Sequence, residues 1–170
     1  EFRTKPDSCH AFVIDEVHDG LLAVLTAARA KVAGSKLTLQ NVFEIDDLVL
    51  KSSEDKYVAL GCLPSKNVYG DRGLHVKNPR ELKHRFAGGH IHFAIHNELH
   101  KNIPNMVKAL DAISGIAGVC LAQSIDKPIR RQFYGLAGEY RTPSYGLEYR
   151  TLSNYWLCHP IIANLTLDLA

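Results

Sequence analysis

The sequence predicts an α+β fold in which an antiparallel sheet carries helices packed on one face. Two stretches, 13–33 and 104–122, place apolar residues at helical spacing. Three short stretches, 56–62, 88–95 and 145–150, have the composition or alternation of strands. These strands are too few and too irregularly spaced for a doubly wound parallel sheet, so an antiparallel sheet fits better.

The first helix is expected to stop at Gly34, and the second has Pro104 in its first turn. Residues 154–166 predict a third helix, with Pro160 as a break or a first-turn residue. The residues that we expect on the buried face of the second helix are Met106, Leu110, Ile113, Ala117 and Cys120.

Composition and charge describe one soluble globular domain over residues 1–170. Hydrophobic residues make up 46% and charged residues 22% of the chain. A net charge of +2 is too small to indicate a nucleic acid or an anionic membrane as partner. No apolar run reaches the ~18 residues that a membrane span needs. The four cysteines form no CxxC pair, which favours reduced thiols and a cytoplasmic location.

The sharpest local motif is Gly-Gly-His-Ile-His at 88–92. On a strand His90 and His92 share a face, while the apolar residues between and after them face the core. Gly88 and Gly89 leave room for a ligand or for another backbone to approach closely. Imidazoles bind divalent metals or hydrogen-bond to phosphates. The alternative is that both histidines lie on a solvated strand face.

A second motif is Tyr-Gly-Leu-Glu-Tyr-Arg at 145–150, in which Glu148 and Arg150 share a strand face. A carboxylate can ligate Mg²⁺, and a guanidinium can hold phosphate oxygens with two hydrogen bonds. The alternative is an ordinary surface ion pair.

The third motif is a basic stretch with interleaved glycines, which contains Lys127, Arg130, Arg131 and Arg141. It suits a site that handles a polyanionic leaving group, although a solvated basic loop has the same composition. Carboxylates, paired histidines and arginines together are the groups that phosphoryl transfer uses. Because no GxxxxGK[ST] or GxGxxG motif is present, a nucleotide site would have to be built on the sheet.

The three motifs, with Gly-x-x-Gly-Glu-Tyr-Arg at 135–141 and the continuation Thr-Leu-Ser-Asn-x-Trp, resemble the glutamine-synthetase-like amidoligases. More narrowly, they resemble the COOH–NH2 ligase type 2 group of tailed phages, over roughly residues 1–160. The resemblance implies a sheet of the glutamine synthetase catalytic-domain type. It also implies an ATP- and Mg²⁺ (or Mn²⁺)-dependent ligase that joins a small-molecule or peptide carboxylate to an amine through an acyl phosphate.

The resemblance assigns roles to individual residues by motif. His90 and Glu148 match metal ligands, and His92 with Gly88 and Gly89 lies where the family binds the nucleotide phosphates. Arg150 matches the arginine beside substrate and phosphate. Three further arginines lie where the family places phosphate-binding ones, namely Arg130, Arg131 and Arg141.

Glu1-Phe2-Arg3-Thr4 is similar to a metal-binding strand of more distant carboxylate–amine ligases, which implies Glu1 as a third metal ligand. The acidic strand that starts the family's domain does not precede Glu1, so we expect the chain to lack its N-terminal strand or strands. The resemblance also implies that a homo-oligomer is possible and, for a phage protein, that the location is the host cytoplasm. Two alternatives stay open: an inactive amidoligase-fold protein with a structural or interaction role, such as that of a virion component, and a zinc module that uses His90 and His92.

Overall fold

The computed structural model describes residues 2–58, 65–70, 78–122 and 124–170. The main sheet has four strands in the order β2-β5-β6-β4, and every pairing in it is antiparallel. A separate two-stranded antiparallel sheet joins β1 to β3. The strands are β1 (Val42–Glu44), β2 (Lys66–Asn67), β3 (His84–Phe86), β4 (Ile91–Ala94), β5 (Glu139–Arg141) and β6 (Gly146–Tyr149).

The α-helices are short apart from the first. They are α1 (His10–Lys31), α2 (Asp47–Ser52), α3 (Asp55–Val58), α4 (Ile103–Leu110), α5 (Ile116–Leu121), α6 (Arg130–Phe133) and α7 (Pro160–Asp168). One π-helical turn, η3 (Asp111–Gly115), connects α4 to α5 without a break. Within the described ranges the 3₁₀ helices are η1 (Pro79–Glu81), η2 (Asn97–Asn102) and η4 (Asn154–Cys158).

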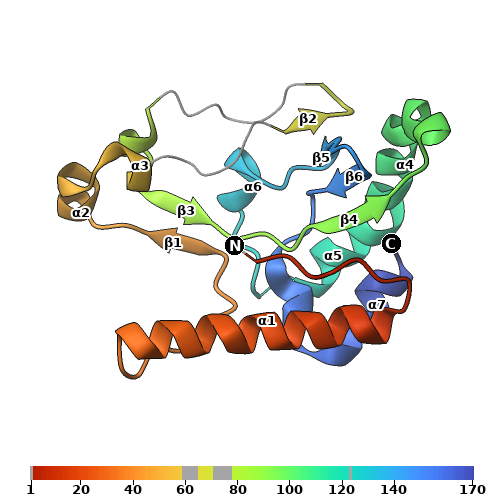
Figure 1. Cartoon of the computed structure of the whole chain (residues 1–170). Helices are drawn as coiled ribbons and strands as arrows, with labels where there is room; N and C mark the ends of the chain where they lie inside the picture. The colour runs from red at the N-terminus through yellow and green to blue at the C-terminus, as the bar shows by residue number, and fades with distance from the viewer. Residues whose placement is uncertain (1, 59–64, 71–77, 123) are drawn as a thin grey trace.

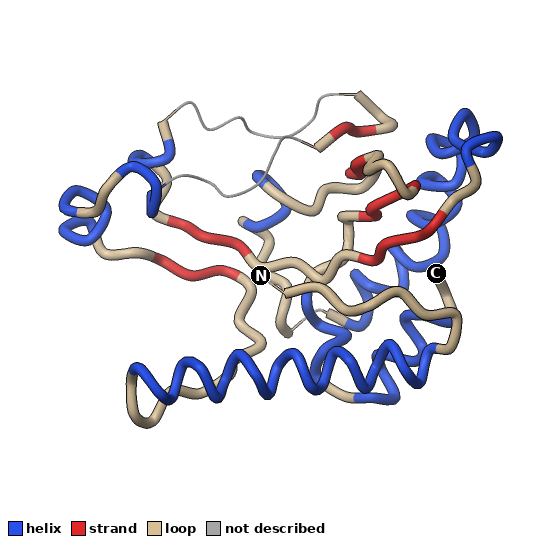
Figure 2. Tube along the Cα trace, in the orientation of Figure 1, coloured by secondary structure: helices blue, strands red, loops and turns tan. Residues whose placement is uncertain are grey.

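The core lies between the four-stranded sheet and the helices. Ile91 of β4 and Leu147 and Tyr149 of β6 are buried against α4, η4 and α7, with Val17 of α1 in the same apolar cluster. Figure 1 shows α1 along the base of the molecule, below both sheets. Figure 2 shows the two sheets at opposite sides of the view, with most of the helical mass under the larger sheet. The predicted α+β class with antiparallel pairing is confirmed.

The helix predictions hold better than the strand predictions. The expected helix at 104–122 is the continuous run α4-η3-α5, and Pro160 occupies the first turn of α7. The strand expected at 56–62 is wrong for residues 56–58, which belong to α3, and its remainder lies outside the described residues. Valine and tyrosine are common in strands, but strand propensity depends strongly on context, and here Asp55 begins a short helix that includes both Tyr57 and Val58.

The buried face predicted for the second helix is right at Leu110, which is buried, and at Met106, which packs against the core, but it is wrong further along the helix. Ile113 is 55% exposed and Cys120 is exposed, whereas the small residues Ser114, Gly115 and Gly118 face the core. A Cβ on Gly115 would lie 2.9 Å from the Tyr149 hydroxyl oxygen, so glycine lets this helix approach the sheet closely.

The cysteines, the helix lengths and the N-terminal segment can each be compared with the predictions over the described residues. Cys9, Cys120 and Cys158 are free thiols, as predicted, and Cys62 lies outside the described residues. Over the described ranges, none of the helices has the length and apolar character that crossing a membrane requires. The N-terminal segment forms no strand over residues 2–9, and Glu1 lies outside the described residues.

Candidate active site

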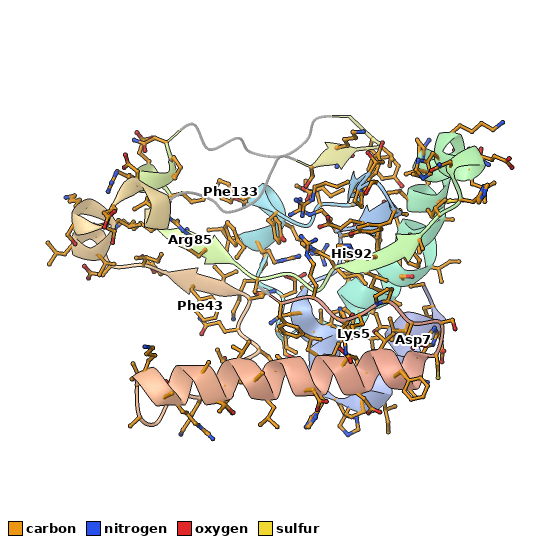
Figure 3. All side chains as sticks on the ribbon, viewed as in Figure 1. Lys5, Asp7, Phe43, Arg85, His92 and Phe133 are labelled. Atoms are coloured by element: carbon orange, nitrogen blue, oxygen red, sulfur yellow. The ribbon has the colours of Figure 1, made fainter. Side chains whose placement is uncertain are left out.

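The four-stranded sheet has one polar face, on the side away from the core. Antiparallel partners share a face, and the pairing places Arg141 of β5 opposite Glu148 of β6, which in turn is opposite His92 of β4. Figure 3 labels His92 on β4. We call the following set the polar face: His90, His92, Glu139, Arg141, Glu148 and Arg150.

Glu148 is the centre of the polar face. Its Oε1 lies 2.5 Å from Nη2 of Arg141, 3.1 Å from Nδ1 of His90 and 3.4 Å from Nε of Arg150. Burial alone would raise the pKa of Glu148, but the hydrogen bonds with His90 and Arg141 outweigh burial and lower this pKa to about 2. Glu148 is therefore ionised at neutral pH and only accepts hydrogen bonds.

His90 lies between Glu148 and Tyr134. Its Nε2 is 2.5 Å from the Tyr134 hydroxyl oxygen, and its Nδ1 faces Glu148. Burial lowers the pKa of His90 despite the nearby carboxylate, so the ring is neutral at neutral pH. Tyr134 also lies under two guanidinium groups, because Cζ of Arg130 and Cζ of Arg150 are each 5.1 Å from the centre of its ring.

His92 is the exposed histidine of the pair. Its Nδ1 is hydrogen-bonded to the hydroxyl of Tyr145, which lies just before β6. Burial lowers the pKa of His92, and the charge of Arg3 lowers it further. The N-terminal segment therefore passes close enough to the polar face for Arg3 to act on His92 electrostatically.

Glu139 is a site residue that sequence reasoning missed. Its Oε2 accepts a hydrogen bond from the Gly135 amide at 3.1 Å, and its side chain is buried. Burial raises the pKa of Glu139, although Arg150 and Arg130 act in the opposite direction. The Glu-x-Arg spacing of Glu139 and Arg141 repeats that of Glu148 and Arg150, and this repeat is a signal that the sequence does contain.

Arg130 and Arg131 do not lie on the polar face. Arg130 is fully buried and donates to the carbonyl oxygens of Ala87 and Leu152, both at 2.9 Å. Its guanidinium packs so tightly on Gly135 that a Cβ there would lie 2.4 Å from Nη1. Arg131 pairs with Asp126, with 2.6 Å between Nη2 and Oδ2. Arg130 thus fastens the segments next to the site, while Arg131 keeps a partly exposed side chain.

The two glycines before β4 are explained by neighbouring side chains. A Cβ on Gly89 would lie 2.4 Å from Nε1 of Trp156, and one on Gly88 would lie 2.7 Å from Nε2 of His90. The indole of Trp156 donates to the Gly89 carbonyl at 3.1 Å. The groups that approach these two glycines closely are therefore the side chains of Trp156 and His90.

The described side chains do not fit a divalent metal centre. Mg²⁺ takes about six ligands, mostly oxygen, and tolerates little distortion. Across the described ranges, no group of three or more His, Cys, Asp or Glu side chains could hold an ion. His90 and Glu148 face each other and donors from Arg141 and Tyr134, and the third expected ligand, Glu1, lies outside the described residues. Zinc has the same shortage of ligands.

Two surface hollows lie elsewhere in the molecule. One, of about 400 Å³, is bordered by Glu44, Asp46, Asp47 and Lys83. The other, of about 470 Å³, is apolar and lies between the end of β4, α4 and the C-terminus. Neither includes a side chain of the polar face, so the site is defined by its charged groups and not by these hollows.

The polar face brings together the two histidines and the two Glu-x-Arg motifs by which the sequence resembles carboxylate–amine ligases. Residues 79–170, more than half of the chain, match the model of the family described as phage phiEco32-like COOH.NH2 ligase-type 2. The chain belongs to this family. No curated protein and no solved structure matches it.

Proposed function

We propose that this protein is an ATP-dependent carboxylate–amine ligase that forms an amide through an acyl phosphate, on a sheet of the glutamine synthetase type. The family description supports ligation of a carboxyl group to an amine. The observation that carries the rest of the proposal is that Arg141, Glu148 and His92 lie directly opposite one another on three neighbouring strands. This arrangement places charged side chains that can bind an anion on one face of the sheet.

The exposed groups of the polar face suit phosphate or carboxylate oxygens. The side chain of Arg141 is 20% exposed, and His92 is exposed beside it. Glu148 holds the Arg141 guanidinium through Nη2, which fixes the cation before any substrate arrives. Preorganised cations of this kind stabilise charge that spreads over a transferring phosphoryl group.

The deeper arginines have a supporting role in this proposal. Arg150 is only 1% exposed and lies against Glu148 and the Tyr134 ring. Arg130 is fully buried and bonded to backbone carbonyls. Both hold the exposed groups in position and keep the local charge positive, whereas Arg141 remains within reach of a ligand on the polar face.

The reaction that we propose has two steps. The substrate carboxylate attacks the terminal phosphorus of ATP and releases ADP, and the resulting acyl phosphate is then attacked at its carbonyl carbon by the amine, which releases phosphate. Mg²⁺ or Mn²⁺ belongs to this proposal as the usual companion of ATP. Because the described residues do not form a centre for it, no step here depends on a protein-bound ion.

The test is ADP release by the full chain with ATP, Mg²⁺ and a panel of amino acids and short peptides as acids and amines. We expect sustained release over many turnovers only when both an acid and an amine are present, because the first step alone releases at most one ADP per enzyme until the amine discharges the acyl phosphate. Arg141→Met should lower the rate at least 100-fold, which is about 2.7 kcal/mol of lost charge stabilisation. Lys66→Met is the matched control, since Lys66 is an exposed cation in β2, opposite Tyr140 and on the other face.

Two results would contradict the assignment. If Arg141→Met and Lys66→Met reduce the rate equally, the polar face is not the site. If the full chain binds no ATP with Mg²⁺ present, the inactive amidoligase-fold protein is the better description.

A further inference from the structure

The imidazole of His90 has a hydrogen-bonding partner at each nitrogen. Nδ1 lies 3.1 Å from a carboxylate oxygen of Glu148, and Nε2 lies 2.5 Å from the Tyr134 hydroxyl oxygen. The side chain is 16% exposed, so little of the ring is left to solvent. Any ligand for His90 has to replace one of these two partners.

The hydrogen bonds determine the tautomer of the ring. Glu148 also contacts Arg141, so it is a carboxylate that can only accept, and the proton between it and His90 belongs to Nδ1. A neutral imidazole with Nδ1 protonated has its single lone pair on Nε2. The Tyr134 hydroxyl then donates to Nε2.

Tyr134 also orients the arginines around the site. Its ring lies 5.1 Å from Cζ of Arg130 and 5.1 Å from Cζ of Arg150. The same side chain thus fixes His90 through its hydroxyl and packs against two cations through its ring. The absence of a side chain at Gly88 makes the space, because a Cβ there would lie 3.0 Å from Cε1 of Tyr134.

We propose that Tyr134 is a positioning residue which, together with Glu148, holds His90 in the Nδ1-protonated tautomer and occupies its lone pair, so that His90 serves a carboxylate–imidazole–phenol chain and not a metal ion. This assignment differs from the metal-ligand role that the family resemblance implies for His90. The catalytic part of this inference rests on the proposed function. There, the hydrogen-bonded series of carboxylate, imidazole and phenol would keep Glu148, and through it Arg141, in position for the substrate anion.

The test needs no catalysis. Histidine ¹⁵N resonances of the full chain are recorded at neutral pH for the wild type, Tyr134→Phe and Tyr145→Phe. In the wild type His90 should be the Nδ1–H tautomer. Tyr134→Phe keeps the ring over the arginines but should shift the His90 Nε2 resonance downfield, because its lone pair loses a donor. Tyr145→Phe removes the equivalent hydroxyl at His92 and should leave His90 unchanged.

Zn²⁺, which binds imidazole well, supplies a second readout. Tyr134→Phe should bind Zn²⁺ at His90 about three- to tenfold more tightly than the wild type does, the effect of removing one competing hydrogen bond. The proposal is overturned if wild-type His90 is the Nε2–H tautomer, which needs no variant to observe. It is also overturned if wild type and Tyr134→Phe give the same His90 resonances and the same Zn²⁺ affinity. Either failure leaves the ADP-release test intact, so the two proposals fail separately.

Discussion

At the scale of single residues, Glu148 is the group on which the polar face most depends. It is a buried carboxylate whose Oε1 has three nitrogen atoms within 3.4 Å. Removing one partner of a buried ionic network leaves the others uncompensated, which is more costly than losing an exposed ion pair.

Glu148→Gln is predicted to lower the free energy of unfolding by about 3 kcal/mol at pH 7, because it leaves Arg141 and Arg150 without their carboxylate. The pKa of Glu148 is lowered in the folded protein to about 2, so its contribution is complete above the unfolded value near 4.5 and is lost as the pH falls toward 2. The difference between wild type and variant should therefore shrink below about pH 4.5, as urea unfolding at several pH values will show.

Glu16→Gln is the control for this prediction, since Glu16 makes an exposed pair with Lys5. Its effect should stay below about 1 kcal/mol at pH 7. An equal loss in both variants would mean that Glu148 is not the centre of a buried network.

Glu139→Gln is predicted to change stability with the opposite dependence on pH. Burial raises the pKa of Glu139, so this carboxyl contributes most below its unfolded pKa and loses that contribution as the pH rises through its folded pKa. The glutamine does not titrate, and its amide oxygen can still accept from Gly135. Relative to wild type, the variant should therefore become more stable from about pH 4 to pH 7, measured by thermal unfolding. Unchanged relative stability across that range would contradict the assignment.

The sequence predicted much of this residue-scale arrangement. The alternating pattern correctly placed His90 with His92, and Glu148 with Arg150, on one face of the sheet. The reason is that side chains along a strand alternate between the two faces. It could not place Tyr134, since the loop before β5 brings Tyr134 to His90 from 44 positions away along the chain. It also could not show that Arg130 is buried, because arginine is usually exposed.

At the scale of elements, the lesson of the second long helix is that small residues can face the core. The apolar pattern favoured Ile113 and Cys120, yet the residues buried there are Ser114, Gly115 and Gly118. A prediction that ranks helix positions by the size of their apolar side chains misses small residues. Such residues are buried because they let the helix approach neighbouring elements closely. The sequence of α1 had no such conflict, and its start and end were predicted within a few residues.

Gly89→Ala is predicted to destabilise the entry to β4 by about 1–3 kcal/mol, since its Cβ would lie 2.4 Å from Trp156 and 2.7 Å from the Ser153 carbonyl oxygen. Gly20→Ala is the matched substitution in α1. There the Cβ would meet only the ring of Phe2, which is 36% exposed and can move, so helix propensity should raise stability by about 0.5–1 kcal/mol. Urea midpoints shifted in the same direction by both variants would contradict this account.

At the scale of the whole molecule, a buried polar cluster links the ends of the two-stranded sheet to α6 and to the segment before it. Ala87, just after β3, accepts from Arg130 and donates its amide to the Asn41 carbonyl. Asn41 and Arg131 both reach Asp126. The second sheet could not be predicted from the sequence, because Val42–Glu44 and His84–Phe86 are three-residue strands whose paired residues lie 40 to 44 positions apart.

Asp126→Asn is predicted to loosen this junction more than the four-stranded sheet. It removes the charge that Arg131 pairs with at 2.6 Å and that lies 3.7 Å from Arg130. We expect hydrogen exchange of the β1 and β3 amides to accelerate at least tenfold, while amides of β6 change less. Uniform acceleration across both sheets would show that the sheets unfold together and that Asp126 does not act locally.

The central claim is that the polar face promotes phosphorylation of a substrate carboxylate. The most direct measurement is transfer of ¹⁸O from the labelled carboxylates of an amino acid and peptide panel, with ATP, Mg²⁺ and hydroxylamine as the amine. The account predicts one ¹⁸O atom in each inorganic phosphate released, together with a hydroxamate, and loss of both products in Arg141→Met. Phosphate free of ¹⁸O, or label that appears in AMP, would contradict it.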